Sequence, residues 1–201
     1  MGRVQSDVEA VMSAHQDIID GMPSVTVVIS AVFKHWFNFD RVPEDVLEAA
    51  KKRGTDVHAA CATIAKGFFP MCIPAEYLGY IDSFLRWRDL MVDEFLLVDE
   101  RIIDPLLGYL GTPDLLIRSR QNEIILPDLK TPAALMPTWR WQLPAYDHLV
   151  ADNLGLKIDR CGSLRLNREG KPAAMKYYED RDRRQNFTVF LSALNVYKNA
   201  K

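Results

Sequence analysis

Residues 109–131 read YLGTPDLLIRSRQNEIILPDLKT, and the rest of the chain is best understood from this stretch. Two mainly apolar segments, Tyr109–Ile117 and Glu123–Lys130, flank the polar run Arg118–Asn122. Apolar segments of this length bounded by polar turn residues are typical of β-strands. We therefore predict two strands joined by a turn, with another strand before them over residues 95–103.

Outside this stretch, helical and strand patterns alternate along the chain. Residues 24–28, which follow Pro23, fit either the start of a strand or a buried helix. Helices are expected at 7–20, 44–64, 75–93, 138–152 and 182–198, and a hairpin at 158–178. This order predicts an α/β protein with a central mixed β-sheet flanked by helices. We expect one domain over residues 1–201, mainly helical up to residue 94, with the sheet and its helices in 95–201.

Three charged residues stand inside the predicted strands. Asp114 follows a proline, whereas Asp128 and Lys130 lie two apart, so strand alternation turns both to one face. If the two strands are adjacent, the three side chains converge. Two carboxylates at one point repel each other, which favours a bound divalent cation, and all-oxygen ligands suit Mg²⁺ or Mn²⁺ better than zinc. Taken singly, each motif is more typical of a surface salt bridge.

The neighbouring motifs strengthen the metal-site interpretation because they follow the order of a known family. Over residues 23–150 the chain resembles the PD-(D/E)xK nuclease superfamily, specifically its RecB-like and phage-type exonuclease branch. The resemblance implies a restriction-endonuclease-like core. The matching segments are Pro23–Thr26, the RGT-x-x-H pattern from Arg53 to His58, Glu100–Asp114 with its G-x-x-D end, Asp128–Thr131, and the pair Gln142 and Tyr146.

The resemblance also implies roles for these residues. Asp114 and Asp128 would ligate the metal together with His58 and the backbone carbonyl of Leu129. Lys130 would position or deprotonate the attacking water. The expected reaction is hydrolysis of a phosphodiester to a 5′-phosphate and a 3′-hydroxyl.

The remaining matched positions carry supporting roles. Glu100 would assist the site or bind a second metal ion, with Glu94 and Asp99 as rival acids. Gln142 would order the catalytic groups. The residues expected to contact DNA are Arg53, Arg140, Gln142 and Tyr146.

The charge of the chain argues against one class of DNA-binding protein. The chain carries 25 Lys and Arg against 27 Asp and Glu, for a net charge of −2. Residues 1–114 have a net charge of −8 and residues 115–201 a net charge of +6. A near-neutral total argues against a tight, nonspecific DNA coat protein, but it is compatible with an enzyme that holds DNA locally.

The sequence also argues against a membrane-spanning protein, a secreted protein and an iron–sulfur protein. The longest apolar run, Val25–Phe33, is shorter than the ~20 residues that a membrane-spanning helix needs. The first ten residues lack the apolar segment of a secretory signal, so we expect a cytoplasmic protein, encoded by a phage or a bacterium. The three cysteines, Cys61, Cys72 and Cys161, cannot supply the four thiolates of a cubane iron–sulfur cluster.

The sequence thus predicts a Mg²⁺- or Mn²⁺-dependent DNA exonuclease of recombination, repair or replication, without an iron–sulfur cluster. A structure-specific endonuclease of the same fold and a non-catalytic DNA-end-binding module are the alternatives. DNA is the expected partner. A single-strand annealing or replication partner and a homo-oligomer remain open.

Overall fold

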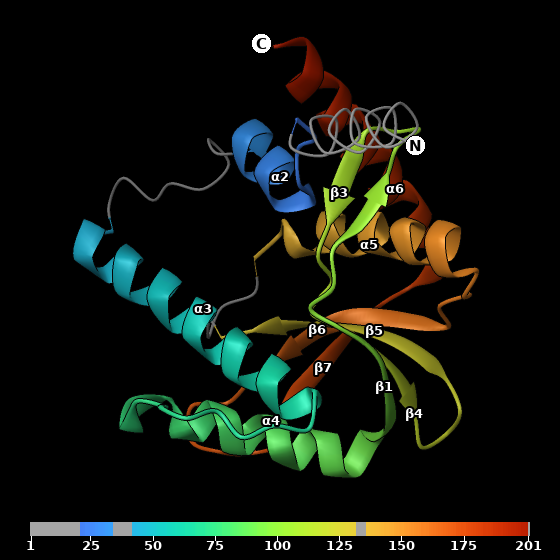
Figure 1. Cartoon of the computed structure of the whole chain (residues 1–201). Helices are drawn as coiled ribbons and strands as arrows, with labels where there is room; N and C mark the ends of the chain where they lie inside the picture. The colour runs from blue at the N-terminus through green and yellow to red at the C-terminus, as the bar shows by residue number, and fades with distance from the viewer. Residues whose placement is uncertain (1–20, 34–41, 132–135, 201) are drawn as a thin grey trace, which may run out of the picture.

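A five-stranded mixed sheet forms the centre of the computed structural model, which describes residues 21–33, 42–131 and 136–200 (Figure 1). Its strand order is β1-β4-β5-β6-β7. β5 and β6 run parallel, and the other neighbours are antiparallel. The strands are β1 (Val92–Val98), β4 (Leu115–Ser119), β5 (Ile124–Lys130), β6 (Arg160–Arg165) and β7 (Ala174–Tyr178).

Helices cover both faces of the sheet. One apolar core lies under α2 (Val25–Phe33), α5 (Trp139–Leu154) and α6 (Asp180–Asn199). The other lies under α3 (Glu44–Ala65) and α4 (Leu78–Met91), which a short 3-10 turn, η3 (Ala75–Tyr77), precedes. Figure 1 shows α4 and α5 on opposite sides of the sheet. The predicted α/β class, with a central mixed sheet, flanking helices and a helical N-terminal region, is confirmed.

Two predicted strands are each divided in the structure. The segment 95–103 is interrupted at Asp99, whose φ of 53° lies in the left-handed region, and it resumes as β2 (Ile102–Asp104). The segment 109–117 breaks around Pro113 into β3 (Tyr109–Gly111) and β4. β2 and β3 pair with each other as a separate two-stranded sheet. The break places Asp114 just before β4, where its backbone carbonyl accepts a hydrogen bond from the Asp99 N–H at 3.0 Å.

The other boundaries follow the predictions with local changes. The segment after Ser24 is a helix, α2, because its apolar residues pack against α5 and α6 rather than joining the sheet. The helix expected through residue 93 ends at Met91, and β1 begins at Val92. The helix expected at 7–20 lies outside the described residues.

A proline inside the central strand β5 marks the point where β4 and β5 separate. Their pairing covers Ile125 and Ile124 only, whereas the pairing of β5 with β6 continues from Ile125 to Lys130. Pro127 has no N–H to donate, and it comes after the last paired residue on the β4 side. The two strands therefore diverge toward the carboxyl end of β5, which leaves room for side chains between them.

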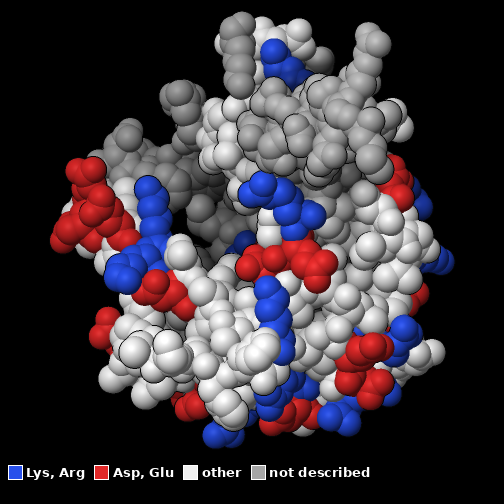
Figure 2. Space-filling model, viewed as in Figure 1, with Lys and Arg blue, Asp and Glu red and all other residues white. Residues whose placement is uncertain are grey.

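Charged side chains are interspersed on the face shown in Figure 2, with acidic groups gathered over the start of α3, where Glu44 and Asp45 lie. The opposite net charges of the two halves of the chain therefore do not appear as two separate patches in this view. None of the helices in the described part of the chain has the length and apolar character needed to cross a membrane.

Candidate active site

Asp114 bridges the gap between the diverging strands β4 and β5. Its Oδ2 accepts a hydrogen bond of 2.7 Å from the backbone N–H of Leu129. Alternate residues of a strand direct their backbone groups to opposite neighbours. Because Lys130 accepts a bond from Leu166 beyond β6, the backbone groups of Leu129 face the β4 side, where Asp114 stands. The carboxylate thus replaces a missing strand partner at this point.

Asp128 and Lys130 lie on the same face of β5, as the sequence spacing predicts. Lys130 Nζ is 2.5 Å from Asp128 Oδ2 and 3.3 Å from Gln142 Oε1. Gln142 in turn donates from Nε2 to the hydroxyl of Tyr146 at 2.9 Å, one turn further along α5. A polar chain therefore runs from the centre of the sheet to α5.

His58 reaches this group from α3 on the other side of Asp114. Its Nδ1 is 3.2 Å from Asp114 Oδ1, and both side chains are partly buried. Burial by itself disfavours the charged forms of both groups. Their mutual attraction and hydrogen bond outweigh burial, so the pKa of His58 is raised and the pKa of Asp114 is lowered.

The surroundings of Asp128 disfavour the ionised form of its carboxyl group. Its carboxyl is 2 % exposed, and burial raises its pKa from 3.8 to about 6, with the attraction of Lys130 opposing the rise and the charge of Asp114 adding to it. Oδ2 of Asp128 is ion-paired with the Lys130 ammonium at 2.5 Å, and no other group in the described part of the chain hydrogen-bonds to it. The raised pKa shows that one ammonium does not fully offset the cost of burying this carboxylate beside Asp114, and a divalent cation would offset more of it.

By residue type this group matches a hard divalent cation, although the ligand atoms of His58, Asp114 and Asp128 do not all lie within 4.8 Å of one another in this structure. Asp114, Asp128 and the Leu129 carbonyl offer oxygen ligands, and His58 offers a nitrogen, which suits Mg²⁺ or Mn²⁺. A cavity of about 220 Å³ opens beside them and is lined by His58, Asp114 and Leu129. Asp128 faces Lys130 in this structure, so ligation would require its carboxylate to turn toward Asp114.

Three of the predicted site residues lie away from this group. Glu100 is exposed, and its neighbour Asp99 lines the cavity instead. Arg53 borders a different cavity next to Thr131, and its buried Nε has no hydrogen-bond partner. Arg140 is exposed at the start of α5, where its Nε donates to Pro137 O at 3.1 Å.

Sequence reasoning missed the contribution of β6 and β7. Ser163 stands opposite Asp128 on β6, and Lys176 stands opposite Ser163 on β7. The hydroxyl of Tyr178 lies 3.2 Å from Ser163 Oγ. No local motif marks these residues, because their relation to Asp128 arises only from the pairing of the strands.

A second group of metal-ligand type lies on another part of the molecule. Asp104 on β2 and His148 and Asp152 on α5 bring one ligand atom each within 4.8 Å of the others, the one such trio in the described part of the chain. Asp104 already accepts bonds from two backbone N–H groups, and His148 lies 3.1 Å from its second oxygen. These residues are compatible with a divalent cation and also serve as polar partners for one another.

Comparisons with known proteins give limited information. No family model matches the chain, and no curated protein matches its sequence. Among solved structures, it is similar to a "Putative exonuclease" from Eubacterium rectale, with 11% identity and a TM-score of 0.48. The match covers 74% of this chain and 68% of the other.

Proposed function

We propose that this protein is a divalent-metal-dependent deoxyribonuclease that hydrolyses phosphodiester bonds at DNA ends. The observation that carries the proposal is the buried Asp128 beside Asp114 and Lys130, at the point where β4 and β5 diverge. Burial and the charge of Asp114 raise the pKa of Asp128 even though Lys130 is its ion-pair partner, and buried acids perturbed in this way are concentrated at functional sites.

Each residue has a role in this reaction. Asp114, Asp128, His58 and the Leu129 carbonyl would hold Mg²⁺ or Mn²⁺, which would lower the pKa of the attacking water and neutralise charge on the phosphate. Lys130, held between Asp128 and Gln142, positions that water for in-line attack. The water oxygen would bond to phosphorus as the bond to the 3′-oxygen breaks, and a proton released by the water would pass through solvent to the departing 3′-oxygen, which leaves a 5′-phosphate and a 3′-hydroxyl.

The positions of Gln142 and Tyr146 support this arrangement. Gln142 fixes the Lys130 ammonium through its Oε1, and the Tyr146 hydroxyl fixes the Gln142 amide. Burial raises the pKa of the Tyr146 hydroxyl, so it stays protonated and serves as a hydrogen-bond partner rather than as a base.

Degradation of end-labelled linear duplex, closed circular duplex and single-stranded DNA in Mn²⁺ tests the proposal. We expect cleavage of the linear substrates in wild type, and its loss in Asp114→Asn and Lys130→Ala. Asp89→Asn is the matched control, because Asp89 is exposed on α4 and forms its ion pair with the neighbouring Arg88.

The outcomes separate the competing functions. Cutting of the closed circle, which has no ends, would show that the enzyme is an endonuclease and not an exonuclease. DNA-end binding in EDTA without hydrolysis in Mg²⁺ or Mn²⁺ would refute the proposed enzymatic activity and favour a non-catalytic binding module. Equal activity in wild type and Asp114→Asn would refute the assigned site.

A further inference from the structure

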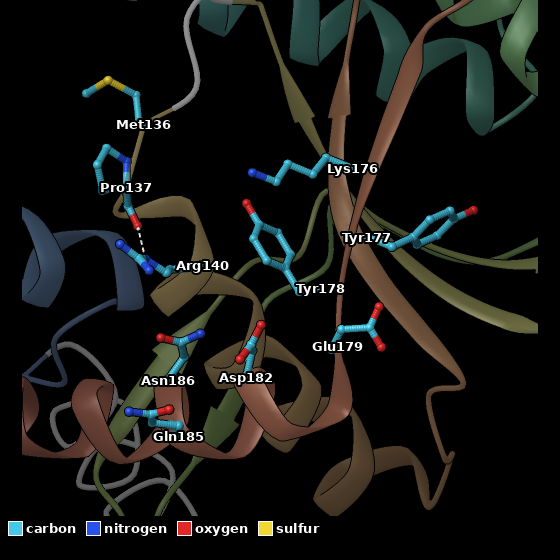
Figure 3. A pocket seen from close by; sticks show the side chains of 10 residues that line it. All are labelled: Met136, Pro137, Arg140, Lys176, Tyr177, Tyr178, Glu179, Asp182, Gln185 and Asn186. Carbon is cyan, nitrogen blue, oxygen red and sulfur yellow. Dashed lines mark hydrogen bonds between the residues drawn. The ribbon is translucent and has the colours of Figure 1, made fainter.

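A polar cavity of about 490 Å³ lies beside the candidate active site, between the start of α5, β7 and the start of α6. Figure 3 shows Lys176 and Tyr178 extending from β7 toward Arg140, with Asp182 and Asn186 of α6 below them. The ring of Tyr177, the next residue along β7, points away to the other face of the strand (Figure 3). Neither the metal ligands nor Lys130 line this cavity.

The register of the sheet connects this cavity to Asp128. Asp128, Ser163 and Lys176 are paired in a row across β5, β6 and β7, and paired residues of neighbouring strands share a face of the sheet. Because neighbouring strands lie ~4.8 Å apart, the backbone of Lys176 lies about 10 Å from that of Asp128. The hydroxyl of Tyr178 lies within hydrogen-bond distance of Ser163, the middle residue of this row. A strand of DNA whose phosphate lay at Asp128 would have its adjoining nucleotides at this cavity.

The side chains in the cavity match the parts of a nucleotide. Lys176 and Arg140 supply two cations for phosphate oxygens. The Lys176 ammonium lies over the ring of Tyr178, 6.0 Å from its centroid, and the ring would be free to stack on a base when Lys176 turns to a phosphate. Asn186 and Asp182 supply groups of the kind that hydrogen-bond base edges, the carboxylate by accepting from an amino group. Two acids, Glu179 and Asp182, line the cavity and would be unfavourable for bare phosphate, so the set suits a nucleoside with its phosphate rather than an inorganic anion.

The volume of the cavity favours an unpaired nucleotide over duplex DNA. Its volume falls within the ~300–1,000 Å³ of sites for single small ligands, whereas protein–duplex interfaces spread over roughly 1,000–2,500 Å² of surface. We propose that this cavity binds one unpaired nucleotide next to the bond cleaved at Asp128, so that the substrate is a single strand or a frayed duplex end. This inference rests on the proposed function for the position of the cleaved bond.

Fluorescence anisotropy in EDTA tests the cavity without the reaction, with a short labelled single strand and a blunt duplex of the same sequence. Wild type should bind the single strand more tightly. Tyr178→Ala should weaken single-strand binding about ten-fold or more, because a base would lose its stacking partner. Tyr178→Phe keeps the ring and should bind like wild type, and Tyr177→Ala is the matched control on the opposite face.

A second pair of variants keeps the test informative if Tyr178→Ala does not fold. Lys176→Gln should weaken binding and reduce its salt dependence, because one phosphate contact is lost. Lys171→Gln removes the same charge from the turn before β7, where Lys171 pairs with the exposed Glu169, and should leave binding unchanged. Equal affinity of wild type for duplex and single strand would overturn the proposal. So would an equal loss of single-strand affinity in Tyr178→Ala and Tyr177→Ala, or in Lys176→Gln and Lys171→Gln.

A substrate series links the cavity to the cleaved bond. In Mn²⁺, a single abasic position should slow hydrolysis only when it lies next to the bond being cut, and an effect independent of its place would overturn that link. If wild type hydrolyses nothing but the discrimination in EDTA holds, the proposed nuclease is refuted while the nucleotide site is supported. Hydrolysis without that discrimination would refute the nucleotide site alone.

Discussion

Asp128→Asn should make the metal-free protein more stable at neutral pH, although it removes one partner of a buried ion pair. Burial raises the pKa of Asp128 from 3.8 to about 6, in spite of the attraction of Lys130. A rise of that size means that ionised Asp128 destabilises the folded protein by about 3 kcal/mol. Asparagine has the shape of the neutral acid and would remove that cost.

The direction of the pH dependence follows from the raised pKa. The folded protein binds a proton at Asp128 more tightly than the unfolded chain does, so stability is lost as pH rises from 3.8 to about 6. The advantage of Asp128→Asn should therefore be complete above that range and should vanish below it.

Urea denaturation in EDTA, at neutral pH and at a pH below 3.8, measures this difference. Asp89→Asn is the control, because an exposed ion pair contributes little to stability. Addition of Mn²⁺ should reverse the order at neutral pH, since wild type would gain about 4.1 kcal/mol at a thousand-fold excess over its dissociation constant, which exceeds the destabilisation by ionised Asp128. The variant, which lacks a ligand, should gain much less.

A lower stability of Asp128→Asn in EDTA at neutral pH would refute the reasoning. Asp128 would then be a structural partner of Lys130, and the cost of leaving the ammonium unpaired would exceed the relief from burial. Equal stabilisation of both proteins by Mn²⁺ would refute the assignment of Asp128 as a metal ligand.

Three further predictions concern packing near the site, the role of Lys130, and the burial of the cysteines. Gly111→Ala should lower the free energy of unfolding by about 1–3 kcal/mol in urea titrations, because a Cβ there would lie 2.7 Å from the ring of Tyr146; unchanged stability would contradict this packing. Lys130→Ala should slow hydrolysis by about 10²–10⁴-fold while calorimetry still detects Mn²⁺ binding, and loss of both would indicate a folding defect. In the native protein a thiol reagent should label the exposed Cys72 quickly and the two buried cysteines slowly, and three equal rates would contradict the fold.

Much of the secondary structure could be read from local patterns because its causes are local. The expected helix 138–152 is α5, which ends at Gly155 with a φ of 62°, a conformation that glycine adopts without strain. The apolar spacing after Pro43 likewise predicts α3. The placement of Asp128 and Lys130 on one face needed only the two-residue period of a strand.

The breaks in the strands could not be read in this way. Asp99 adopts a left-handed conformation, and its N–H bonds to the carbonyl of Asp114, fifteen residues further along the chain. No pattern around Asp99 indicates this contact. The same contact explains why Asp99, rather than Glu100, lines the cavity at Asp114.

The sequence by itself determined which residues share a face and in what order the charged motifs occur, because periodicity and spacing are properties of a single segment. The tertiary structure alone decided that β4 and β5 diverge beyond Ile125, that Asp128 is buried close to Asp114, and that Lys176 is paired in the same row of residues as Asp128. The physical reason is strand pairing. Backbone hydrogen bonds bring segments far apart in the chain to neighbouring positions, and the pattern within any one segment does not specify its neighbour.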